Sequence, residues 1–198
     1  MTFFRHRVAP APAPRACRRW LPLMLLALPF YGAQSASGAD PVSKEYQIKA
    51  AFLYNFTKFV VWPAQRPNSP GNPFVIGVLA RNPFGDELAK VARGRRVGER
   101  PLQVRVLQSA QEAHAVDLLF IGAGEEARLG ELASLHAASV LTVGESPGFA
   151  AQGGIITFSV VRDRVRFEIN RDAGLRARLK ISPQLLKLAV PAQKGRNS

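Results

Sequence analysis

Residues 45–63, EYQIKAAFLYNFTKFVVWP, carry the clearest hydrophobic pattern in the chain, because their apolar residues recur at spacings of three and four. This is the period of one face of an α-helix. The apolar residues on that face are Ile48, Phe52, Phe56, Phe59 and Val60. Ser43 stands at the N-cap position, and Glu45 falls in the first turn, where a carboxylate suits the helix dipole. Pro63 prevents much continuation beyond Trp62, so the pattern predicts a buried first helix.

Three later runs are almost wholly apolar, which is typical of strands covered on both faces. They are residues 74–80 (FVIGVLA), 116–122 (VDLLFIG) and 140–143 (VLTV). Residues 102–107 (LQVRVL) alternate instead between apolar and polar side chains. This alternation predicts a strand with one polar face, which would suit a sheet edge.

Helical patterns separate these strands. A helix is predicted to begin with Pro83 at its first position and to end at Gly94. Residues 109–114 have room for one helical turn, and residues 125–138 form an amphipathic helix. Strands that alternate with helices favour a parallel sheet, because each crossover places a helix on a face of the sheet.

The pattern changes after Gly144. Residues 155–161 and 165–169 form two runs with Arg162, Asp163 and Arg164 between them, which predicts a hairpin. Two short helices are then expected, at residues 171–180 and 182–189, with Ser182 as the cap of the second. We therefore predict one three-layer α/β domain that has a mostly parallel sheet, a C-terminal antiparallel hairpin and flanking helices.

The N-terminal segment has the pattern of a secretory signal peptide. Residues 1–20 contain five arginines and no acid, and an apolar run of eleven residues follows at 21–31. A membrane-spanning helix takes about 20 apolar residues, so this run is too short for an anchor. Small residues then precede Asp40, where we expect cleavage. The expected parts are a cleaved signal peptide (1–39), an α/β domain (40–192) and a disordered tail (193–198).

Composition narrows the expected partners. Cleavage would remove five arginines and no acid, which lowers the formal charge from +13 to +8. In an exported protein this charge favours acidic protein faces or anionic lipid headgroups over nucleic acid, and it is equally compatible with a soluble, merely basic surface. The only cysteine, Cys17, would leave with the signal peptide, so we expect no disulfide, thiolate metal site or cysteine nucleophile.

Nothing in the sequence points to an enzyme. His114 and His136 lie far apart and match no catalytic or metal-binding spacing. The Gly122-Ala123-Gly124 segment resembles the start of a dinucleotide fingerprint, but it lacks the third glycine at the required spacing. The two acids that follow would also repel a pyrophosphate. We therefore expect no catalytic residue, no metal and no cofactor.

Two groups of polar residues leave alternatives open. Arg93, Arg95, Arg96 and Arg100 are compatible with a solvated loop or with a docking face for an acidic partner. Glu168 and Asn170 occupy alternate positions of an apolar strand and so share one face. They are compatible with hydrogen bonds that hold the C-terminal helices or with a ligand pocket.

Several segments, taken in this order, resemble the YfiR-like family of small exported bacterial proteins. They are KAAFLYNFTKFVVWP (49–63), FVIGVLARNPFGDEL (74–88), VDLLFIG (116–122), PGFAAQGGIITF (147–158), VRFEIN (165–170) and ISPQLLKLA (181–189). The resemblance implies a periplasmic α/β domain that does no chemistry. It also implies binding to the periplasmic part of an inner-membrane diguanylate cyclase or sensor kinase, with restraint of cyclic-di-GMP signalling. An outer-membrane lipoprotein that sequesters the protein is a further implied partner.

Candidate partner contacts are exposed aromatic and charged residues beside loops, although each also fits a core or scaffold role. They are Trp62, Phe84, Phe149, Arg166, Glu168 and Asn170. A homodimer is compatible with the sequence. The alternative function is a periplasmic module that binds a small anion at the carboxyl ends of the parallel strands, where open α/β sheets usually bind ligands.

Overall fold

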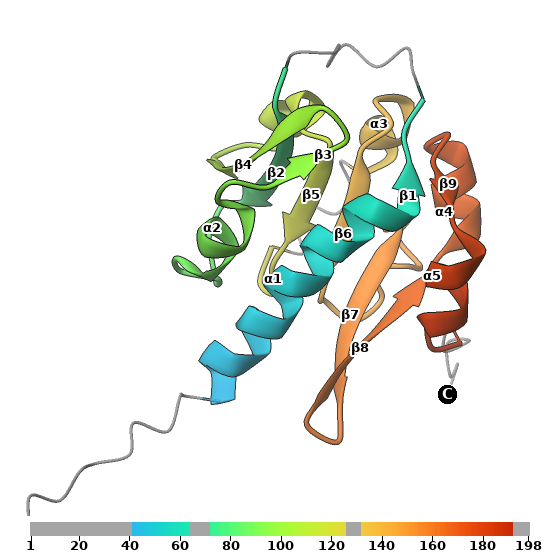
Figure 1. Ribbon diagram of the computed structural model, residues 1–198. Helices are drawn as coiled ribbons and strands as arrows, with labels where there is room; N and C mark the ends of the chain where they lie inside the picture. The colour runs from blue at the N-terminus through green and yellow to red at the C-terminus, as the bar shows by residue number, and fades with distance from the viewer. Residues whose placement is uncertain (1–40, 64–71, 126–131, 192–198) are drawn as a thin grey trace, which may run out of the picture. The chain divides into compact units, whose positions relative to one another are not determined.

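The structure is a computed structural model that describes residues 41–63, 72–125 and 132–191 (Figure 1). The expected signal peptide (1–39) and tail (193–198) lie outside the described residues. So does the middle of the loop before the first long strand, together with the first half of the helix expected at 125–138.

Seven strands form the central sheet, which is mostly parallel and ends in the predicted antiparallel hairpin, while the short antiparallel strand at Arg96–Val97 was not predicted. They are β2 (Phe74–Leu79), β3 (Arg96–Val97), β4 (Arg100–Leu107), β5 (Leu118–Ile121), β6 (Leu141–Gly144), β7 (Ile156–Val161) and β8 (Arg164–Ile169). Their order is β3-β4-β2-β5-β6-β7-β8. The pairs between β4 and β7 are parallel, whereas β3 and β8 are antiparallel to their neighbours. From β2 the chain first adds β4 on one side and then β5 on the other. The topological switch point therefore lies between β2 and β5.

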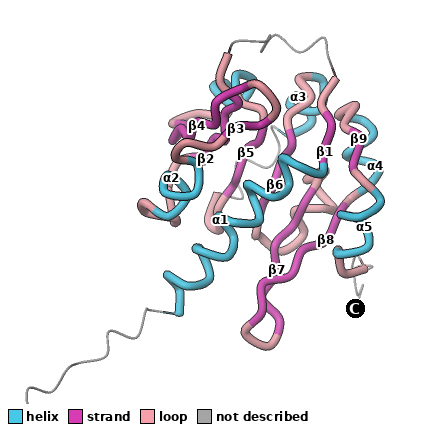
Figure 2. Tube along the Cα trace, in the orientation of Figure 1, coloured by secondary structure: helices cyan, strands magenta, loops and turns pink. Residues whose placement is uncertain are grey.

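Helices cover both faces of this sheet and confirm the three layers (Figures 1 and 2). They are α1 (Pro41–Phe59), α2 (Glu87–Ala92), the 3-10 helix η1 (Gln111–Ala115), α3 (Leu132–Ala137), α4 (Arg171–Arg176) and α5 (Pro183–Leu188). Buried residues of α1, α2, α4 and α5 join one hydrophobic cluster, while those of η1 and α3 join a second cluster on the other face. The sheet therefore separates two cores.

Helix α1 supplies the centre of the larger core, as its pattern predicts. Phe56 is fully buried, and its ring centroid lies 5.8 Å from that of Phe158 and 5.1 Å from that of Phe167. Phe52 adds an edge contact to Phe167 at 5.5 Å. The buried face of the helix includes Leu53, which is 0% exposed. Ile48 lies outside this face and is 38% exposed, so its predicted burial is wrong.

Both ends of the first helix differ from the prediction. Helix α1 begins at Pro41, so Ser43 lies inside the helix, and the chain leaves the helix after Phe59. The next two residues form β1 (Val60–Val61), which pairs antiparallel with β9 (Lys180–Ile181). Valine favours strands, and this pairing satisfies backbone groups that a helix end would leave open. The helix expected at 171–180 ends at Arg176, and Lys180 and Ile181 belong to β9 instead.

The second helix also begins later than predicted, at Glu87. The side chain of Asn82 closes a turn instead, because its Oδ1 accepts a hydrogen bond from the Phe84 N–H at 3.0 Å and its Nδ2 donates to the Gly85 carbonyl at 3.0 Å. Asparagine side chains commonly stabilise turns in this way. In contrast, the Ser182 cap of α5 is confirmed, since its Oγ accepts a hydrogen bond from the Leu185 N–H at 3.2 Å.

The predicted hairpin is present, with a loop one residue shorter than expected. Arg162 and Asp163 both have positive φ values, 51° and 58°, and Arg164 already belongs to β8. Two successive positive φ values are typical of the type I′ turn, whose twist matches that of the strands it joins.

Two glycines make room for Phe149 in the smaller core. The Phe149 ring is fully buried and lies against the backbone of Gly144 and of Gly154. A Cβ atom at Gly144 would lie 2.6 Å from the Phe149 Cδ2 atom, closer than packed carbon atoms approach. These glycines are therefore required by close packing.

We expect Gly144→Ala to lower the free energy of unfolding by about 1–3 kcal/mol, because the added methyl group overpacks the core. Gly122→Ala is the matched control, since its Cβ would meet no atom closer than 3.6 Å. Urea denaturation of both variants checks this expectation. Equal stability of the two variants would contradict the packing argument.

Candidate functional site

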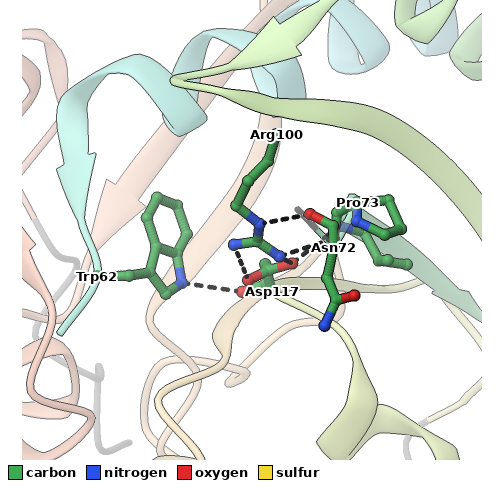
Figure 3. Close-up of polar contacts among 6 residues, drawn as sticks. Trp62, Asn72, Pro73, Arg100 and Asp117 are labelled. Atoms are coloured by element: carbon green, nitrogen blue, oxygen red, sulfur yellow. Dashed lines mark hydrogen bonds and ion pairs between the residues drawn. The ribbon is translucent and has the colours of Figure 1, made fainter. Parts of the chain in front are cut away.

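A buried ion pair joins the amino ends of the central strands (Figure 3). Arg100 donates to both carboxylate oxygens of Asp117, at 2.9 and 2.8 Å, and the Asp117 side chain is fully buried. Arg100 also donates to the carbonyl oxygens of Asn72 at 3.0 Å and Pro73 at 2.7 Å. The planar guanidinium of arginine suits bidentate pairing of this kind. The Asp117 carboxylate therefore has a structural role. The docking role considered for the arginine cluster therefore does not extend to Arg100.

Trp62 belongs to this network. Its Nε1 donates to the Asp117 carbonyl oxygen at 3.2 Å, and its ring meets that of Phe74 edge to face with centroids 5.0 Å apart. The residue is half-buried. Trp62 is thus held in place beside the amino ends of β2 and β5 and remains partly exposed.

We expect Arg100→Met to lower the free energy of unfolding by about 3–5 kcal/mol, because it leaves the Asp117 carboxylate buried without its cation. Arg96→Met is the control, since the Arg96 side chain is 56% exposed and that of its partner Glu99 is 97% exposed. Exposed pairs contribute little to stability. Similar unfolding midpoints for the two variants would show that the buried pair does not stabilise the fold.

A second polar cluster lies at the carboxyl end of β6, around Glu145, which directly follows the strand. The Glu145 Oε1 atom accepts hydrogen bonds from the Tyr46 hydroxyl at 3.0 Å and from the Ala123 N–H at 2.9 Å. Lys49 forms ion pairs with both Glu145 and Glu45, and it is 3% exposed. Burial, and then the Glu145 charge, raise the pKa of Tyr46, so its hydroxyl stays protonated and donates.

This cluster occupies the place where an open α/β sheet usually binds its ligand. The Glu145 carboxylate accepts the Ala123 N–H in the glycine-containing turn that follows β5, so an anion approaching this turn would meet a negative charge. A turn is present at Ala123 and Gly124, and the Ala123 amide already has a partner. The geometry at this edge therefore gives no support to binding of a small anion.

We expect Lys49→Met to lower the free energy of unfolding by about 3 kcal/mol or more, because it removes the cation from the Glu145 carboxylate, whose side chain is 7% exposed. Adding Glu145→Gln should recover part of the loss by removing the unpaired charge. Urea denaturation of the single and double variants measures this coupling. A double variant no more stable than the single one would contradict it.

The two candidate phenylalanines lie inside the protein. Phe84 is 3% exposed, and its ring contacts those of Tyr46 and Phe120 at centroid distances of 5.4 and 4.7 Å. Phe149 fills the smaller core. Both residues are therefore part of the hydrophobic core, which is one of the two roles expected for them.

Two candidates, Arg166 and Glu168, lie on one side of β8, as the alternation of strand side chains requires, and the third, Asn170, directly follows the strand. Arg166 is exposed and Glu168 is half-buried, and neither forms an ion pair with another described residue. Asn170 caps α4 by accepting the Ala173 N–H at 3.0 Å, and its Nδ2 donates to the Ala150 carbonyl at 2.8 Å. Asn170 therefore holds a C-terminal helix, which is one of its two expected roles.

An open hollow lies beside Asn170, directly after the end of β8. It measures about 500 Å³, and its lining includes Asn170, Arg176, His136 and the loop at residues 150–153. His136 lies with its Nε2 2.8 Å from the Gly153 carbonyl oxygen. In register opposite Glu168, Thr157 has a buried Oγ1 without a hydrogen-bond partner in the described part of the chain. We call Arg166, Glu168, Asn170 and this hollow the β8 surface.

Trp62 lies apart from the β8 surface. It contacts the amino ends of β2 and β5, whereas β6 and β7 stand between those strands and β8. The six candidates therefore divide into two buried rings, one fixed tryptophan and three residues of a shared surface.

Sequence reasoning missed the residues with the strongest polar contacts. Lys49 stands alone among the buried apolar residues of its helix, and Asp117 directly precedes the buried run of β5. Each is a charge within a stretch predicted to be buried, which requires a partner. That signal predicts pairing but not the partner, since Glu145 lies 96 residues from Lys49 and Arg100 lies 17 residues from Asp117.

Among the described residues, no group of three or more metal-ligating side chains could hold an ion. Within the same ranges, every helix is too short or too polar to cross a bilayer.

A model of the YfiR/HmsC-like family matches residues 46–190, which is more than half of the chain. The chain belongs to the YfiR/HmsC-like family. This is a regulatory, non-catalytic family known for controlling cyclic-di-GMP signalling in the periplasm. The resemblance inferred from the sequence segments is thereby confirmed.

The fold of this YfiR/HmsC-like chain is also found in a solved structure. A conserved domain protein from Vibrio cholerae O1 biovar El Tor str. N16961 superposes with a TM-score of 0.51 and 11% sequence identity. The match covers 74% of this chain and 59% of the Vibrio protein, so at this identity it shows a shared fold alone. No curated protein matches the chain.

Proposed function

We propose that this protein is a periplasmic, non-enzymatic regulator that binds and restrains the periplasmic sensory domain of an inner-membrane diguanylate cyclase or sensor kinase. The observation that carries the proposal is membership of the YfiR/HmsC-like family across residues 46–190. The pairing of buried polar side chains with one another supports it, because such groups stabilise the fold and are not held free for a reaction.

The β8 surface is the proposed contact with the receptor. Arg166 and Glu168 place opposite charges on alternate positions of one strand, and each lacks an ion-pair partner among the described residues. A receptor face with an acid opposite Arg166 and a base opposite Glu168 would complement this arrangement. The half-buried Glu168 is partly desolvated before binding, which strengthens an ion pair formed there.

Restraint follows from binding alone. If the regulator binds the inactive conformation of its receptor more tightly than the active one, it shifts the equilibrium between them toward the inactive conformation. The size of the shift is set by the difference in binding free energy. A difference of about 2.7 kcal/mol changes the ratio of the two populations a hundredfold.

We expect deletion of the gene to raise cellular cyclic-di-GMP and wild-type complementation to lower it again. Arg166→Glu should fail to complement, because like charges facing each other across an interface weaken binding strongly. Arg105→Glu is the matched control, since Arg105 is also an exposed strand arginine but lies on β4, at the other end of the sheet. Cyclic-di-GMP measured in the four strains checks this.

Unchanged cyclic-di-GMP after deletion would remove the diguanylate cyclase as the receptor. Full complementation by Arg166→Glu, with normal complementation by the control, would place the receptor contact outside the β8 surface. Unfolding midpoints of both variants should match the wild type, because both arginines are exposed.

A further inference from the structure

Among the strands that the structure describes, the outer half of the β7–β8 hairpin pairs only within the hairpin itself. Strand β6 pairs with β7 only at Ile156 and Thr157, so the rest of β7 pairs with β8 alone. Phe158 and Phe167 are still covered by α1. Beyond them the hairpin extends past the end of β6, as Figure 1 shows.

The hairpin tip, residues 160–164, combines exposed apolar side chains with arginines. Val160 and Val161 are each 49% exposed. Arg162 and Arg164 are exposed and form no ion pair with another described residue. A hollow of about 400 Å³ beside the tip is lined by Val161, Arg162, Arg164 and Arg166. Asp163 is the single acid of the tip.

The two valines face opposite sides of the hairpin. Register pairs Val160 with Val165 and Val161 with Arg164, and successive residues of a strand point to opposite faces. A rigid protein face laid against the hairpin would cover one of these valines and leave the other in water. A fluid bilayer interface surrounds an inserted tip and covers both.

We propose that the hairpin tip binds the headgroup region of an anionic phospholipid bilayer. The two valines enter the interface between headgroups and acyl chains, and Arg162 and Arg164 bind lipid phosphates. Guanidinium groups suit this role, because they pair with phosphate through two parallel hydrogen bonds. Each basic residue near an anionic bilayer strengthens binding by roughly fivefold, so the attachment is weak and reversible.

This inference goes beyond binding to the receptor and does not require it. Arg166 and Glu168 continue along β8 from the tip toward the sheet. Attachment through the tip would therefore hold the β8 surface close to the bilayer, where a membrane receptor exposes its sensory domain. Confinement near the membrane raises the effective concentration of the regulator for such a receptor.

Co-sedimentation with vesicles tests the proposal, using protein purified in its processed form from cells that export it. Vesicles of phosphatidylglycerol and phosphatidylethanolamine are compared with vesicles of phosphatidylcholine. We expect binding to the anionic vesicles only, with a decline as salt rises because screening weakens exposed charges. The double variant Arg162→Glu/Arg164→Glu should weaken binding by roughly 25-fold or more. Loss of each arginine accounts for roughly fivefold, and the new glutamates are also repelled by the anionic lipids.

Arg93→Glu/Arg105→Glu is the matched control, because it changes the net charge equally at exposed positions away from the hairpin. Val160→Ser/Val161→Ser should weaken binding while leaving every charge in place. Equal losses in the two arginine pairs would overturn the proposal in favour of a general effect of net charge. Wild-type protein that stays in solution with anionic vesicles would also overturn it, and tip variants that lose only receptor binding would indicate a protein partner instead.

Discussion

The packing of α1 against the β7–β8 hairpin is the contact on which the rest of the structure depends. Phe52 and Phe56 pack against Phe158 and Phe167, so the first helix and the last long strands share one core. This packing holds the base of the hairpin against α1, while the outer part of the hairpin extends beyond these contacts.

Two polar networks secure the opposite edges of the sheet. The pair of Arg100 and Asp117 joins β4 to β5 at the amino edge, while Lys49 and Glu145 join α1 to the end of β6 at the carboxyl edge. Both use charged residues whose isolated burial would be costly, so each network favours one arrangement of the strands. The pair of Lys49 and Glu145 lies near the carboxyl ends of the strands, where open α/β sheets usually bind ligands.

Most of the fold could be predicted from the sequence because the signals for its larger elements were local. Hydrophobic period identified the buried strands, and Ser182 marked the start of α5. The short strands β1 and β9 were missed because they form only through pairing of Val60–Val61 with Lys180–Ile181, which no local pattern encodes. The same limit applied to the site: alternation placed Arg166, Glu168 and Asn170 on one side, but burial of Phe84 and Phe149 depended on rings and glycines from other segments.

The partners of α1 have a consequence for how the chain reaches its native state. Tyr46 and Glu145 are separated by 99 residues, and Lys49 and Glu145 by 96. The aromatic contacts of the helix reach further still, to β8. Such non-local contacts slow folding, because distant segments must meet before they gain stability. A chain synthesised from its N-terminus would therefore carry an unpacked, aromatic first segment until most of the polypeptide had been made, which would make that segment the one most in need of protection by a chaperone.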